Sequence, residues 1–125
     1  MAAEKPIPFI ATNDREAQPL KTLGHCWTAV HEKAGQIAAM ADLAPEPMDT
    51  VTSRLDQALA VSGTHSYGAA LRGLEDVDML VTMGLTALRE VKARGRDANA
   101  PALALWREFY HAREAVLTVL EPAAA

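Results

Sequence analysis

Apolar side chains recur along most of the chain at alternating spacings of three and four residues. This is the period of an α-helix that packs on one side. The first such run consists of Leu20, Leu23, Trp27, Val30, Ala34, Ile37 and Ala41. Pro45 and Pro47 follow it, and proline does not continue a helix. The pattern therefore predicts one long helix over about residues 20–41.

A short second helix and a long third helix follow, each ending near a glycine. The second is expected from Asp49, whose side chain can cap the first amides, to Val61. The third is expected from Tyr67 to Val91, with Gly95 as its stop, because glycine adopts the left-handed conformation that ends helices. The middle of the third helix is apolar over more than one face. This width indicates a central position or a contact with another subunit.

The fourth helix is expected between Asn99, which can cap it, and Pro122, and it carries two parallel apolar rows. Four helices with short connections predict an all-α fold, an antiparallel up-and-down four-helix bundle with a short second helix. The bundle is one domain over residues 20–121, and residues 122–125 are expected to be a frayed tail.

Residues 1–19 lack the helical period and contain Pro6, Pro8 and Pro19. Proline removes a backbone donor and disfavours helix in the residue before it. We therefore expect an extended N-terminal arm over this segment. Its apolar residues, Phe9 among them, are expected to lie on the bundle or on a neighbouring subunit.

Composition narrows the possible partners and locations. The formal net charge is −4, which repels phosphate backbones and makes nucleic acid an unexpected partner. Cys26 is the single cysteine, so neither an intramolecular disulfide nor a thiolate zinc cluster can form within one chain. No secretory signal precedes the helices, and the apolar runs are shorter than the ~20 residues of a membrane span. We expect a cytoplasmic protein that binds neither nucleic acid nor a membrane.

One pair of residues has the spacing of metal ligands. Glu108 and His111 stand three apart on the fourth helix, as in di-iron carboxylate bundles. Such bundles need this spacing twice together with two further glutamates, and it occurs once here. Both residues also lie opposite the apolar rows. A solvated face is the favoured interpretation, and a metal-binding helical bundle is an alternative.

Histidine phosphotransfer is another alternative. The helix–loop–helix over residues 88–120 resembles the last two helices of histidine-containing phosphotransfer domains. That family places a lysine three residues and a small residue four residues after its histidine. His31 has Gly35 at the fourth position, but Lys33 comes one residue early, and His65 lacks the lysine. The resemblance implies a phospho-accepting His31 or His65, and the sequence departs from the family at the lysine.

Gly84 lies inside the predicted third helix, where glycine costs about 1 kcal/mol relative to alanine. Either close helix packing or a slot for a small apolar ligand can compensate, and packing is the favoured interpretation. The sequence has no phosphate-binding loop, dinucleotide fingerprint or serine nucleophile elbow. We therefore assign no catalytic residue and no cofactor.

The surplus of apolar helix surface favours a non-enzymatic interaction or accessory module. We expect it to form a homo-oligomer or to bind a protein partner. The expected partner contacts are the large apolar residues Phe9, Met83, Trp106 and Tyr110. This interpretation assumes that the apolar stripes meet in one core and that the histidines remain on the solvated exterior.

Overall fold

The computed structural model describes residues 7–61 and 66–120, with side chains from residue 22 onward. These residues form four helices and no strand: α1 (Ile7–Met40), α2 (Met48–Val61), α3 (Tyr67–Ala93) and α4 (Asn99–Leu120). The predicted all-α fold with four helices and a short second helix is confirmed.

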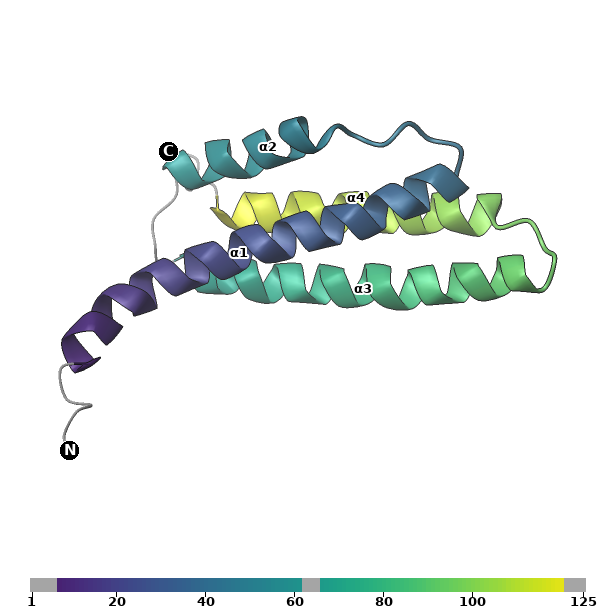
Figure 1. The fold of residues 1–125 in the computed structure, drawn as a ribbon. Helices are drawn as coiled ribbons and strands as arrows, with labels where there is room; N and C mark the ends of the chain where they lie inside the picture. The colour runs from purple at the N-terminus through teal and green to yellow at the C-terminus, as the bar shows by residue number, and fades with distance from the viewer. Residues whose placement is uncertain (1–6, 62–65, 121–125) are drawn as a thin grey trace.

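The helices α1, α3 and α4 form the centre of the molecule, and α2 covers one side of it. Figure 1 shows α2 on the side of α1 and α4 that lies away from α3. The largest fully buried apolar side chains are Trp27, Phe109, Leu23, Ile37, Leu74 and Leu120. On α2, the buried residues Val51, Leu55 and Ala58 recur every three or four positions, as an amphipathic helix requires.

Two of the helices end in the same hydrogen-bonded turn. After α3, Gly95 adopts a φ of 77°, and the Arg96 amide donates to the Val91 carbonyl at 3.1 Å. This is the Schellman arrangement, and it confirms the predicted stop at Gly95. After α1, Asp42 takes the left-handed position with a φ of 59°, so an aspartate does here what glycine usually does.

The N-terminal segment differs from the predicted extended arm. The helix α1 begins at Ile7, so residues 7–19 are helical rather than extended. Pro8 falls in the first turn, where a helix needs no amide donor, and only Pro19 removes an internal hydrogen bond. Figure 1 shows this part of α1 projecting past the ends of the other helices. Residues 1–6 and the predicted tail at 122–125 lie outside the described residues.

The side chain of Leu105 on α4 packs directly against Gly84 on α3. A Cβ atom added there would lie 2.8 Å from Leu105 Cδ1 and closer still to Leu105 Cδ2. Leu105 therefore fills the space beside the glycine, and it is itself buried. The structure supports the favoured interpretation, close packing at Gly84, because Leu105 occupies the space that the alternative assigned to a small apolar ligand.

We predict that Gly84→Ala destabilises the protein by about 1–3 kcal/mol, because Leu105 must leave its position or α3 must move from α4. The matched control is Gly24→Ala in α1, where an added Cβ meets nothing within 4 Å. That change should stabilise by up to about 1 kcal/mol through helix propensity. Urea unfolding of the two variants checks this, and equal stability changes would contradict it.

Candidate functional site

Two polar side chains lie in the core among those described. His31 on α1 is 7% exposed, and Arg113 on α4 is 1% exposed. The expectation that the histidines remain on the solvated exterior is therefore wrong for His31. His25 on α1 and His111 on α4 are exposed, as expected. His31 lies inside because it follows Trp27 by one helical turn and continues the buried side of α1.

The ring of His31 is held on all sides. Its Nδ1 donates to the Trp27 carbonyl at 2.7 Å, and its Nε2 lies 3.3 Å from Arg113 Nη1. A carbonyl only accepts and a guanidinium only donates, so the proton is on Nδ1 and Nε2 accepts. The centroid of the Trp27 ring lies 4.4 Å from the centroid of the imidazole. The centroid of the Phe109 ring lies 5.4 Å from it, with the two rings in a T-shaped arrangement. This geometry requires a neutral imidazole.

The guanidinium of Arg113 reaches two carboxylates. Its Nη1 donates to Glu46 at 2.5 Å, and its Nε donates to Glu114 at 3.2 Å. Its central carbon also lies 5.3 Å from the ring centroids of both Phe109 and Tyr110, within the range of cation–π attraction. Within the described residues, Arg113 Nη2 is buried without a hydrogen-bond partner.

Two further contacts extend this network to α2. Both guanidinium amines of Arg54 donate to Glu114 at 2.7 Å, a bidentate pair. The indole Nε1 of Trp27 donates to the Val51 carbonyl at 2.9 Å. The network thus joins α1, the α1–α2 connection, α2 and α4.

The electrostatics of the network follow from this geometry. Burial lowers the pKa of His31 from 6.5 to about 4, and the neighbouring Arg113 charge acts in the same direction. The hydrogen bonds from Arg54 lower the pKa of Glu114 below 4.5. Two arginines and two glutamates therefore surround an imidazole that is neutral at neutral pH.

The space beside His31 is too small for a substrate. The cavity lined by His31, Glu46 and Trp106 has a volume of about 20 Å³. That is room for about one water molecule. A buried, fully engaged imidazole also offers no free nitrogen to a phosphodonor. The network is therefore arranged to hold helices together, and we do not propose His31 as a phospho-accepting residue.

The other residues singled out from the sequence do not form one site. His65 lies outside the described residues. Glu108 and His111 are both exposed on α4. Within the described part of the chain, no three His, Cys, Asp or Glu side chains gather into a group that could hold a metal ion.

The described members of the four expected partner contacts lie on two helices, α3 and α4. Met83 on α3 is 66% exposed, and Tyr110 on α4 is 44% exposed. Trp106 is half-buried beside Phe109 and lines the small cavity near His31. The side chain of Phe9 lies outside those described. Met83 therefore lies on a different surface from Trp106 and Tyr110.

An apolar groove lies on the other side of the molecule, between α3 and α4. It has a volume of about 390 Å³. Its lining residues are Ala69, Gly73, Asp76, Val77, Leu80, Ala112, Ala115, Val116 and Val119. Small residues on both helices leave this space open, and Asp76 supplies its single charged group. Met79 and Met83 are exposed on α3 as well. We call the groove together with these two methionines the outer face.

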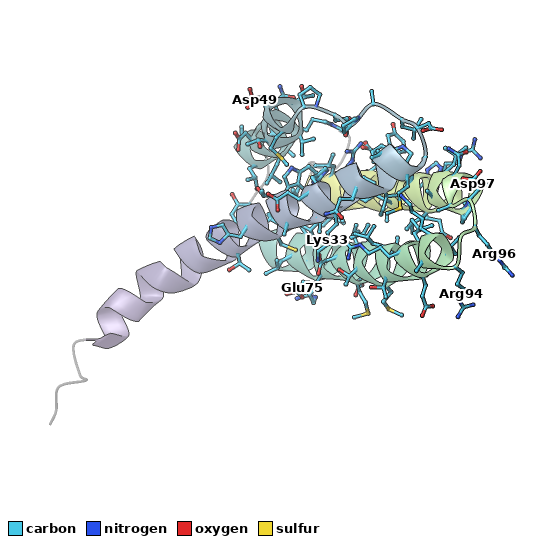
Figure 2. All side chains as sticks on the ribbon, turned by 45° about the vertical axis from the view of Figure 1, so that its right-hand side comes forward. Lys33, Asp49, Glu75, Arg94, Arg96 and Asp97 are labelled. Atoms are coloured by element: carbon cyan, nitrogen blue, oxygen red, sulfur yellow. The ribbon has the colours of Figure 1, made fainter. Side chains whose placement is uncertain are left out.

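The α3–α4 connection at one end of the molecule carries several charges. Figure 2 shows Arg94, Arg96 and Asp97 there, and Lys33 between α1 and α3. Lys33 donates to Asp78 and to Thr82, both at 2.8 Å, so this cation joins two helices. The basic groups near Arg94 follow the C-terminal end of α3, where they complement the helix dipole.

The chain matches no protein-family model, no curated protein and no solved structure. None of the helices of the described residues is long and apolar enough to cross a membrane. The expected cytoplasmic location and the expected lack of nucleic-acid binding stay predictions.

The sequence contains one sign of the buried Arg113, which interrupts an apolar row of the fourth helix. One apolar row of the fourth helix runs through Trp106, Tyr110 and Leu117, and Arg113 occupies the position between the last two. A charged residue on a buried row needs partners. The sequence does not show which carboxylates supply them, because Glu46 is 67 positions away.

We predict that Arg113→Ala destabilises the protein by about 3–5 kcal/mol, because it removes the centre of a buried ion-pair network. Exposed Arg107 on the same helix provides the control, and Arg107→Ala should change stability by about 0.5 kcal/mol or less. Hydrogen exchange should also show α2 opening more readily in Arg113→Ala, since Glu46, in the connection that precedes α2, loses its contact with α4. A cost as small as that of the control would contradict this role.

We predict that His31 makes stability depend on pH between about 6.5 and 4. The unfolded histidine takes up a proton in this range and the folded one does not, so the native state loses stability as the pH falls. The lowered pKa corresponds to about 3 kcal/mol in total. The charged groups that face His31 or its immediate neighbours are Arg54, Arg113, Glu46 and Glu114.

Unfolding experiments at several pH values test the role of His31. His31→Gln should remove the loss of stability between pH 6.5 and 5, and His111→Gln, at an exposed histidine, should retain it. The same slope in wild type and His31→Gln would show that another group is responsible.

Proposed function

We propose that the protein is a non-enzymatic helical interaction module that self-associates through the outer face of α3 and α4. The observation that carries this proposal is the apolar groove of about 390 Å³ between these helices. Contiguous apolar surface of this kind marks interaction sites in proteins. A second copy of the chain is the occupant we propose.

Exposed apolar side chains on the same two helices support the same interpretation. Met79 is 60% exposed, Met83 is 66% exposed, and Val119 is 44% exposed. Methionine is enriched at protein interfaces because its flexible, polarisable side chain adapts to a partner surface. The sequence marked the middle of the third helix as unusually apolar, and a subunit contact there accounts for that width.

The His31–Arg113 network supports a module without chemistry of its own. Both nitrogens of the His31 ring contact groups of the chain. The adjoining cavity of about 20 Å³ has room for about one water molecule. No specific observation favours phosphotransfer or metal binding over this proposal, so we do not develop those alternatives.

We predict that sedimentation velocity shows self-association as the protein concentration rises through the micromolar range. Ala115 is exposed and lines the groove, so Ala115→Arg should weaken association about tenfold or more by placing a charge there. Ala60 is exposed on α2, and Ala60→Arg should leave association unchanged. A strictly monomeric wild type across this range would contradict the proposal.

A further inference from the structure

One exposed stripe of α3 has a symmetric order of charged and apolar residues. Its members are Arg72, Met79, Met83 and Glu90, at successive spacings of seven, four and seven residues. Such spacings place side chains on one side of a helix. All four residues are exposed, so the stripe belongs to the free surface of the chain.

The stripe has a centre at position 81. Met79 and Met83 each lie two residues from it, and Arg72 and Glu90 each lie nine residues from it. At 1.5 Å per residue, the charged groups stand about 14 Å to either side of the methionine pair. The cation lies toward the start of α3 and the anion toward its end.

This order is complementary to itself in one orientation. When a second copy of α3 lies antiparallel across position 81, Met79 meets the partner's Met83, and Arg72 meets the partner's Glu90. A two-fold axis repeats both contacts, since residue i contacts residue j and the reverse. In a parallel arrangement Arg72 would face a second arginine and Glu90 a second glutamate, which is repulsive.

The neighbouring charges fit the same orientation. Glu75 and Asp76 lie six and five residues before position 81, and the matching positions after it are Ala87 and Thr86. Glu75 and Asp76 of one copy therefore face uncharged residues of the other copy. Among the described side chains, neither Arg72 nor Glu90 forms an ion pair within the chain. Both charges are available to a partner.

We infer that the partner of the outer face is a second copy that binds antiparallel, α3 against α3, with Arg72 paired to the partner's Glu90. This inference rests on the proposed self-association and adds its orientation and register. The methionines form the apolar centre of the contact, and the two ion pairs at its ends select the antiparallel orientation. Charged pairs at the rim of an interface act mainly on specificity and register.

Charge reversal tests the register. Arg72→Glu and Glu90→Arg each place two like-charged pairs in the symmetric dimer, so each should weaken self-association about tenfold or more. The double variant Arg72→Glu/Glu90→Arg restores both pairs with exchanged signs and should associate like wild type. An equimolar mixture of the two single variants should form heterodimers, because every pair in that complex is again opposite in charge.

The controls use exposed charges outside the stripe. Arg107→Glu on α4 and Glu32→Arg on α1 match the two charge changes and should leave the dissociation constant unchanged. Circular dichroism of every variant verifies the fold. Sedimentation velocity measures the homodimers, and a fluorescent label on one variant of the mixture reports the heterodimer.

Crosslinking gives a second measurement of the register. In a Cys26→Ala background, Met79→Cys mixed with Met83→Cys should yield a disulfide-linked heterodimer faster than either variant alone. A dissociation constant unchanged by the charge reversals, together with no preference for the Met79→Cys/Met83→Cys disulfide, would overturn the antiparallel register. That result would leave the proposed self-association standing. A monomeric wild type would overturn both.

Discussion

The guanidinium of Arg113 is buried away from water, and the residues packed around it must compensate for the lost solvation of its charge. An ion removed from water costs several kcal/mol unless carboxylates and hydrogen bonds replace the solvent. Glu46 comes from the connection after α1, and Glu114 from the next position of α4. Glu114 is in turn held by Arg54 of α2. Neutralising one buried cation therefore fixes the positions of a connection and a helix.

This requirement explains how a short helix stays on the bundle. The helix α2 packs on α1 and α4 and buries only Val51, Leu55 and Ala58. Fourteen residues with so small an apolar face gain little from helix formation alone. The indole donor of Trp27 and the bidentate Arg54–Glu114 pair give α2 two polar attachments to the central helices. Their directionality sets its position more narrowly than apolar contacts would.

Periodicity predicted most of the fold because the core is built from local apolar stripes. The four helices, the buried face of α2 and the stop at Gly95 all follow from patterns within one segment of the chain. The helix over residues 7–19 was not predicted because the three prolines of this segment indicated an extended chain. Pro8, however, falls in the first turn, where a helix tolerates proline. The His31–Arg113 network was missed for a different reason. It joins residues that are far apart in the sequence, and no spacing rule connects Glu46 with Arg113.

The buried network and the outer face divide the surface of α4 between two tasks. Toward α2, α4 presents Tyr110 and Arg113, and Arg113 donates there to Glu46 and Glu114. Toward α3, it presents Ala112, Ala115 and Val119, which leave the groove open. A large side chain at the alanine positions would fill this space from within the chain, as Leu105 does beside Gly84. The small residues leave an apolar surface that the described side chains do not cover. A second copy can cover it, and an apolar surface requires few hydrogen bonds from that partner.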